Sequence, residues 1–159
     1  MFDNRRVRII KPGEPGRGPI IYVMSRDQRV EDNWAMIFTQ KLAIEHKQPV
    51  IVICPIAADY PDASAQQSIF MILGLKQLET KLKQLRIPFL VTTRDAVNSL
   101  PRLITHLHAG VLVTDFNPLK ESIDWKPRLA DRIDIPFYEV NAHNIVPCWE
   151  VTDKQEYAA

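Results

Sequence analysis

Short apolar runs alternate with longer segments of mixed polarity between residues 20 and 140. The runs are four or five residues long, rich in valine, isoleucine and other apolar residues, and lie at 20–24, 50–54, 89–92, 111–115 and 137–140. Runs of this length and composition are typical of strands that are buried on both faces. The pattern therefore predicts five strands.

Amphipathic segments lie between these runs and predict helices. The segment 31–46 has four apolar side chains on one helical face, namely Trp34, Ile37, Phe38 and Leu42. This face is expected to pack in the core, and Asp27 or Asp32 is expected to cap the start of the helix. The segment 66–85 carries a leucine stripe formed by Leu75, Leu78, Leu82 and Leu85.

Two further helices are expected, one at about 97–108 and a short one within 116–133, where Pro127 limits or kinks it. Alternation of strands with helices indicates an α/β protein, because parallel neighbours need crossover connections and these cover both faces of the sheet. Right-handed crossovers then give a Rossmann-like, doubly wound parallel five-stranded sheet with helices on both faces.

The chain divides into three parts along its length. Residues 1–19 are rich in Arg, Gly and Pro and are expected to form a basic N-terminal arm on the surface. Residues 20–147 form the α/β domain, within which no repeat or linker is visible. Residues 148–159 are expected to be an extended or irregular tail, in which Trp149 is partly exposed or folds back onto the arm near Arg5, Arg6 and Arg8.

Composition excludes several classes of protein. The net charge of +1 disfavours a domain that holds nucleic acid mainly by phosphate neutralisation. No apolar run approaches the roughly 20 residues of a membrane span, and no signal peptide is apparent. Cys54 and Cys148 have no Cys or His neighbour at metal-ligand spacing, which indicates free thiols and no metal site. We therefore expect a cytoplasmic protein with no membrane partner.

The glycine-rich segment GEPGRG, residues 13–18, suggests a phosphate-binding loop at first sight. A dinucleotide-binding fingerprint follows a strand and opens a helix, whereas this segment precedes a strand. We therefore expect it to be part of the surface arm.

Ligands of open parallel sheets bind beyond the carboxyl ends of the strands. This rule selects the loops 25–29, 55–64, 93–95 and 115–120. Three of them carry polar residues that either bind a ligand or serve as turn and capping residues; these are Arg26, Asp27, Arg29, Asp59, Asp62, Asp115 and Asn117.

The sequence predicts no catalytic residue. It contains no nucleophile elbow, no Walker lysine loop and no His-Glu-x-x-His motif. His46, His106 and His108 fall at the carboxyl ends of predicted helices, where positive charge is favourable. His143 is the one histidine expected near the ligand side, and a polar structural role is the alternative there. A pocket without catalytic groups favours a binding domain.

Three long motifs resemble the photolyase and cryptochrome family, and in particular the class II cyclobutane pyrimidine dimer photolyases. They are YVMSRDQRVEDNWAM at 22–36, VTDFNPLK at 113–120 and VNAHNIVPCWE at 140–150. Members of the family carry an Arg-x-x-x-Arg-x-x-Asp-Asn-x-Ala-like pattern at the first motif. The corresponding residues here are Arg26, Asp27, Arg29, Asp32, Asn33 and Ala35, with two residues rather than three between the arginines. Together the motifs cover nearly the whole chain.

The resemblance implies the α/β domain of a light-driven DNA-repair enzyme. Such a domain can hold an antenna pigment, either an 8-hydroxy-deazaflavin or a folate, which passes its excitation to FAD. In this family a separate helical domain binds FAD and the damaged DNA. Residues 148–159 would then begin a connector to that domain, and this domain alone would be inactive in repair.

A flat pigment needs an apolar slot with polar groups at its edge. Carrying the family's antenna cleft over to the loops at the strand ends gives nine expected pigment-contact residues: Met24, Ser25, Arg26, Cys54, Pro55, Asp115, Phe116, Asn117 and Pro118. Two other functions stay open. The chain could be a stand-alone α/β protein that binds a nucleotide or another small ligand, or a structural module that dimerises.

Overall fold

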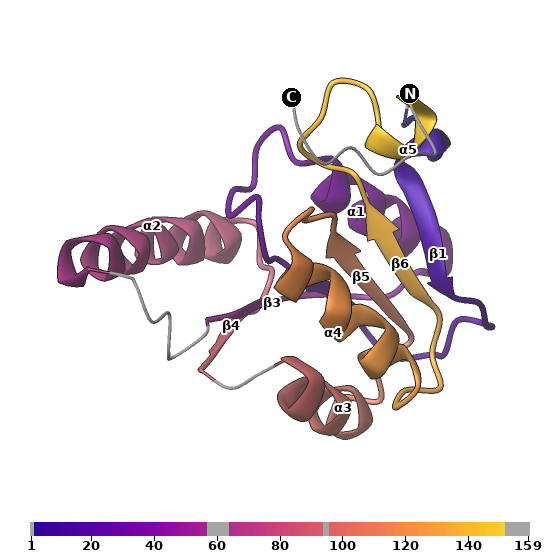
Figure 1. Ribbon diagram of the computed structural model, residues 1–159. Helices are drawn as coiled ribbons and strands as arrows, with labels where there is room; N and C mark the ends of the chain where they lie inside the picture. The colour runs from indigo at the N-terminus through magenta and orange to yellow at the C-terminus, as the bar shows by residue number, and fades with distance from the viewer. Residues whose placement is uncertain (1, 57–63, 94–95, 152–159) are drawn as a thin grey trace.

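A six-stranded sheet forms the centre of the molecule (Figure 1). The computed structural model describes residues 2–56, 64–93 and 96–151. The strand order is β1-β6-β5-β2-β3-β4. The strands are β1 (Val7–Lys11), β2 (Ile20–Val23), β3 (Val50–Pro55), β4 (Phe89–Thr92), β5 (Val111–Asp115) and β6 (Phe137–Val140). Strands β2 to β6 are parallel to one another, which confirms the predicted α/β class.

The strand that sequence reasoning missed is β1. It pairs antiparallel with β6, with Val7 opposite Val140 and Ile9 opposite Tyr138. Residues 7–11 were expected in a surface arm, because this short edge strand carries an arginine and a lysine, follows two further arginines and has no fully buried residue. The sheet is therefore mixed and has six strands, one more than predicted.

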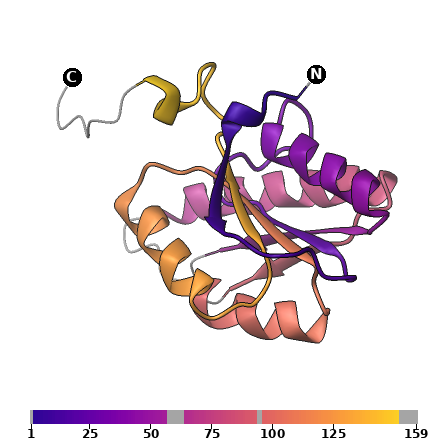
Figure 2. The same ribbon diagram turned by 90° about the vertical axis from the view of Figure 1, so that its right-hand side faces the viewer.

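Helices cover both faces of the sheet, as expected. The helices are η1 (Asn4–Arg6), α1 (Trp34–His46), α2 (Ala65–Gln84), α3 (Ala96–His106), α4 (Lys120–Ala130) and α5 (Cys148–Val151). Figure 2 shows α1 and α2 on one side of the sheet and α3 and α4 on the other. Alternate residues of β2 point into the two layers, so that Tyr22 packs in the α1/α2 core and Val23 packs in the α3/α4 core.

The side of α1 that faces the sheet agrees with the predicted one in part, because Phe38 is buried in the core and Leu42 packs against it. Ala35, Thr39 and Ala43 are buried there at a spacing of four residues, and their small side chains allow the helix to lie close to the strands. Ile37, expected on the buried face, is 40% exposed. Trp34 is only half-buried, although it packs beside the core as expected.

The predicted caps of α1 were also wrong. The N-cap is Asn33, whose side-chain oxygen accepts the backbone N–H of Met36 at 3.0 Å. An N-cap residue needs an extended backbone, and Asn33 has φ −115°. Asp32 has φ 51° and cannot take this position.

The remaining helices lie close to their predicted ranges. Leu75, Leu78 and Leu82 of α2 are buried, whereas Leu85 follows the helix and is exposed. Pro127 lies inside α4 without ending it. None of the helices in the described ranges is both long enough and apolar enough to cross a bilayer.

The start of the tail is helical, contrary to the prediction of an extended or irregular segment. Residues 148–151 form α5, and the expected contact with the arm is present. The Trp149 indole donates to the backbone oxygen of Arg5 at 2.7 Å, and the Arg8 guanidinium lies 5.2 Å from the centre of the ring. Arg6 stacks instead on Trp34, at 4.7 Å. Residues 152–159 lie outside the described residues.

Candidate functional site

The strand order reverses between β2 and β5, and the carboxyl ends of these two strands lie side by side. Asp115, the last residue of β5, is fully buried at this point. Its carboxylate accepts the backbone N–H groups of Ser25, Arg26 and Asp27 at 3.0–3.2 Å. It also accepts the hydroxyl groups of Ser25 and Tyr22. One carboxylate thus fixes the course of the loop that follows β2.

The environment of Asp115 shifts its protonation. Burial raises the pKa of the carboxyl group above its usual range, and the hydrogen bonds from Ser25, Arg26 and Asp27 oppose that shift. The same burial, together with the nearby Asp115 charge, raises the pKa of Tyr22 well above 10.0. The Tyr22 hydroxyl is therefore a stable donor to the carboxylate.

Asn33 holds the same loop from the side of α1. Its amide nitrogen donates to the backbone oxygens of Asp27 and Arg29 and to the Tyr22 hydroxyl, each at 3.0 Å. The asparagine is fully buried. The loop is therefore held by Asp115 on one side and by the helix cap on the other.

Asp27 and Asn141 bring unpaired polar atoms to this edge of the sheet. Asp27 is 8% exposed, and its Oδ1 lies 3.1 Å from Nδ1 of the half-exposed His143. Asp27 Oδ2 and Asn141 Nδ2 are buried and have no hydrogen-bond partner among the described residues. A buried polar group without a partner costs about 1–3 kcal/mol. The carboxyl edge therefore contains a buried carboxylate oxygen and a buried amide nitrogen whose hydrogen-bonding capacity is unsatisfied among the described residues.

Sequence reasoning identified part of this group. Asp27 was singled out, and His143 was expected at the carboxyl edge of the sheet, where it lies beside Asp27. Asn141 was missed because the loop after the fifth predicted strand was not among the four loops considered. Its place directly after an apolar strand is the signal that would have found it.

The buried Arg6 fixes the loop that carries Asn141 and His143. Its guanidinium donates to the backbone oxygens of Asn141, Asn144 and Ile145 at 3.2, 2.7 and 2.5 Å. Sequence reasoning missed this role, because Arg6 lies in a segment that was read as a solvated basic arm. The N-terminal segment is therefore part of the framework of the carboxyl edge.

A second buried charge cluster lies beside it. Glu139 of β6 is fully buried and forms ion pairs with Arg8 of β1 and Lys126 of α4. Lys126 is itself 3% exposed, and its ammonium lies 5.7 Å from the centre of the Phe116 ring. This cluster could not be predicted from the sequence, because its members come from three elements that are distant along the chain.

The nine expected pigment-contact residues fall into two groups. Met24, Cys54 and Asp115 are fully buried. The other six reach the surface to different degrees: Ser25, Arg26, Pro55, Phe116 and Asn117 are half-buried, and Pro118 is exposed. Asn117 also serves its own turn, because its side-chain oxygen accepts the Leu119 N–H at 3.2 Å. Asp59 and Asp62 lie outside the described residues.

The loop after β3 adjoins the loop after β2. Gln28 donates a weak hydrogen bond to the sulfur of Cys54, with the nitrogen 3.6 Å from Sγ. Burial, helped by the Asp115 charge, raises the pKa of the Cys54 thiol to about 12. The Cys54 thiol is therefore protonated and is an unreactive part of the buried core rather than a nucleophile.

The glycine-rich segment lies at the opposite, amino edge of the sheet. Gly16 donates its N–H to Gly110, the residue before β5, at 3.0 Å. A Cβ on Gly18 would lie 1.7 Å from the His108 carbonyl oxygen, so that this close approach requires glycine. The segment packs against the chain itself and is not placed as a phosphate loop, in agreement with the sequence analysis.

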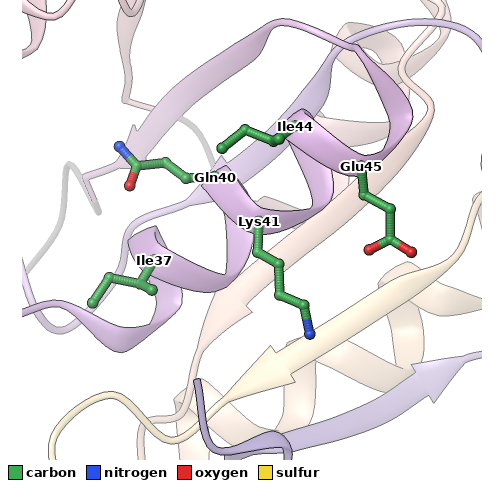
Figure 3. Close-up of a pocket in the computed structure, with 5 residues that line it drawn as sticks. All are labelled: Ile37, Gln40, Lys41, Ile44 and Glu45. Atoms are coloured by element: carbon green, nitrogen blue, oxygen red, sulfur yellow. The ribbon is translucent and has the colours of Figure 1, made fainter. Parts of the chain in front are cut away.

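Two surface depressions lie away from the carboxyl edge. One, of about 450 Å³, is a shallow hollow on the outer side of α1 (Figure 3), lined by Ile37, Gln40, Lys41, Ile44 and Glu45. The other, of about 390 Å³, lies between the end of α2 and the start of β4. Neither has the buried polar atoms found beside β2 and β6.

Within the described ranges, no three His, Cys, Asp or Glu side chains gather where they could hold a metal ion.

Curated relatives match almost the entire chain. A deoxyribodipyrimidine photo-lyase of Arabidopsis thaliana is 40% identical over 97% of this chain, and one of Potorous tridactylus is 37% identical over 99%. The matches cover 32% and 31% of these two proteins. The chain thus spans about a third of the length of the relatives it matches.

Solved structures agree on the fold. A bacterial class III photolyase from Agrobacterium tumefaciens superposes with a TM-score of 0.59 and 20% identity, over 77% of this chain and 26% of that one. A universal stress protein from Archaeoglobus fulgidus in complex with dAMP gives a TM-score of 0.51 and 11% identity, over 81% of this chain and 98% of that one. At these identities the structures show a shared fold alone.

The family model described as DNA photolyase decides between these two groups of neighbours. It matches residues 20–159, which include every parallel strand of the sheet and the loops at their carboxyl ends. The chain belongs to the DNA photolyase family.

Proposed function

We propose that this chain is the light-harvesting part of a photolyase that repairs DNA, and that it holds an antenna pigment at the carboxyl edge of β2, β5 and β6. The observation that carries the proposal is the family match over residues 20–159. The match to about a third of each relative is consistent with an N-terminal domain. FAD binding, DNA binding and the repair reaction would then belong to the remaining polypeptide, to which residues 148–159 would lead.

The residues at this edge fit the polar rim of a pigment. Photolyases bind chromophore cofactors, and a flat heteroaromatic ring system presents both donors and acceptors at its edge. The unpaired Asp27 Oδ2 and Asn141 Nδ2 would bind such groups. The proposed apolar and loop contacts are those of the nine expected residues that reach the surface, namely Ser25, Arg26, Pro55, Phe116, Asn117 and Pro118.

The three buried members of that set have a supporting role in this proposal. Asp115 shapes the loop through its hydrogen bonds, while Met24 and Cys54 fill the space beneath it. The bound pigment would absorb light and pass on its excitation. We propose an 8-hydroxy-deazaflavin or a folate as the pigment, class II as the subgroup and the cytoplasm as the compartment.

Retention of colour tests the proposal. The purified chain is mixed separately with an 8-hydroxy-deazaflavin, a folate and FAD, passed through a desalting column, and examined by visible and near-ultraviolet absorption. We expect stoichiometric retention of one of the first two compounds and no stoichiometric retention of FAD. Retention of FAD alone, or of none of the three, would contradict the proposal.

Nucleotide binding is the alternative that shares this fold. The universal stress protein neighbour is described in complex with dAMP, but its similarity extends to the fold alone. The glycine-rich segment of this chain lies at the amino edge, away from the place where a phosphate loop would open a helix. Equilibrium dialysis with AMP in the same assay distinguishes the two functions, since only the alternative predicts that AMP is retained.

A further inference from the structure

The first half of α2 has an apolar surface that the domain itself does not cover. Residues 65–75, AQQSIFMILGL, contain no charged side chain, whereas the second half of the helix carries Lys76, Glu79, Lys81 and Lys83. A helical segment that is apolar on all sides is normally buried. The second half has an ordinary surface-helix pattern, with Leu78 and Leu82 in the core.

In this structure the segment is exposed. Ile69, Phe70, Ile72 and Leu73 are 57%, 80%, 47% and 54% exposed. We call these four side chains the α2 apolar face. Figure 1 shows α2 extending outward beyond the sheet. Met71 packs against the core, so that the segment is anchored and its outer sides remain uncovered.

Gly74 gives an independent indication at the same turn. Glycine inside a helix costs about 1 kcal/mol relative to alanine. A Cβ on Gly74 would meet nothing within 4 Å, so nothing among the described residues requires the glycine. An element packed closely against this turn would supply the missing reason.

We propose that the α2 apolar face is a docking surface for the part of the photolyase polypeptide that lies outside these 159 residues. This inference rests on the proposed function in that it takes the chain as one part of a photolyase. The relatives are about three times as long as the stretch they share with this chain. Most of their length therefore lies outside the stretch that this chain matches and is available to pack against it. Apolar and aromatic side chains without charges are typical of the core of such an interface.

Two other occupants fit less well. A helix that lies on a membrane surface carries lysine or arginine beside its apolar face, and residues 65–75 have neither. A second copy of this chain would have to cover the same four side chains symmetrically. That arrangement is treated below as an outcome that overturns the proposal.

Cysteine labelling tests the docking. Phe70→Cys is introduced together with Cys148→Ser, and Cys54 stays unreactive because it is buried. Labelling by a maleimide is measured in this chain and in a fusion of this chain to the remaining part of the Arabidopsis thaliana relative. We expect labelling in the fusion to be slower by about ten-fold or more, as for a site opened only by local undocking. Lys83→Cys, at the exposed far end of α2, is the matched control and should react equally in both proteins.

Equal labelling of the Phe70→Cys position in both proteins would overturn the proposal. A second result would also overturn it: slow labelling of this chain on its own, which becomes faster when the protein is diluted roughly hundred-fold. That result identifies a second copy of the chain as the occupant. Cooperative unfolding in urea shows whether the fusion is folded. If the fusion is not folded, hydrogen exchange is compared instead between this chain and the intact relative. At least about ten-fold greater protection of the helix aligned with residues 65–74 supports docking, and equal protection contradicts it. The readouts need neither pigment nor repair, so their failure is separate from a failure of the proposed function.

Discussion

At the scale of single residues, Asp115 organises the carboxyl edge of the sheet. Sequence reasoning weighed a binding role against a turn or capping role for this residue, and the structure shows its carboxylate already bonded to the loop after β2. Burial of that kind is invisible in the sequence, because an aspartate at the end of a strand has the same pattern whether it faces solvent or a backbone loop. Among the described residues, the buried polar atoms that have no partner at this edge belong to Asp27 and Asn141, and to Thr92 at the end of β4.

Asp115→Asn should destabilise the fold by about 2–3 kcal/mol, because an amide nitrogen would replace one of the oxygens that accept backbone N–H groups. Urea unfolding followed by circular dichroism measures the change. Asp124→Asn is the matched control, since Asp124 is exposed, and its effect should stay within about 0.5 kcal/mol. A loss at Asp115 as small as that of the control would contradict the described role.

Cys54 should be unreactive in the folded protein. Thiol reagents attack the thiolate, and a pKa of about 12 leaves almost none at pH 8. Because the folded state raises this pKa above its usual 9.0, the thiol favours folding below pH 9 and loses that contribution as the pH rises toward 12. In the Cys148→Ser variant we expect no reaction with iodoacetamide at pH 8 until the protein is unfolded in urea. Rapid labelling of the native variant would contradict the burial of Cys54 in the folded protein.

At the scale of elements, the five parallel strands were predictable and β1 was not. The five strands are apolar runs, so their composition alone marks them, and the sheet fully buries β2 and β5. Strand β4 was predicted to be buried on both faces, but it lies at the sheet edge, where Leu90 and Val91 are 39% and 45% exposed. Strand β1 is an edge strand, and its stability comes from partners far along the chain, such as Glu139 for Arg8. Part of the buried face of α1 was missed for a related reason. The small residues Ala35, Thr39 and Ala43 also face the sheet, and a pattern of large apolar residues does not reveal them.

Glu139→Gln should destabilise the protein by about 3–5 kcal/mol, because Lys126 would remain buried without an opposite charge. The pair joins β6 to α4, and Arg8 extends it to β1. Thermal or urea unfolding measures the loss, and the exposed Glu45→Gln is the control. Recovery of most of the stability in the double variant Glu139→Gln with Lys126→Met would show that the unpaired lysine is the cause. No recovery would contradict this explanation.

At the scale of the whole molecule, two surfaces stand out on one α/β domain. The carboxyl edge contains buried polar atoms that have no hydrogen-bond partner among the described residues. The α2 apolar face exposes four large apolar side chains to solvent. The sequence motifs predicted the family. The rule for open parallel sheets selected the loops after β2 and β5, but not the loop after β6 that carries Asn141 and His143. Neither the motifs nor this rule predicted the second surface, because the leucine stripe of α2 drew attention to the half of the helix that the core buries.

The central claim is that the carboxyl edge of β2, β5 and β6 binds a pigment. Amide chemical shifts of the ¹⁵N-labelled chain, recorded while an 8-hydroxy-deazaflavin or a folate is added, test it most directly. We expect one of the two pigments to shift the amides of Ser25, Arg26, Phe116, Asn117 and His143, while those of the glycine-rich segment 13–18 stay unchanged. Shifts confined to that segment or to the hollow on α1, or no shift with either pigment, would contradict the claim.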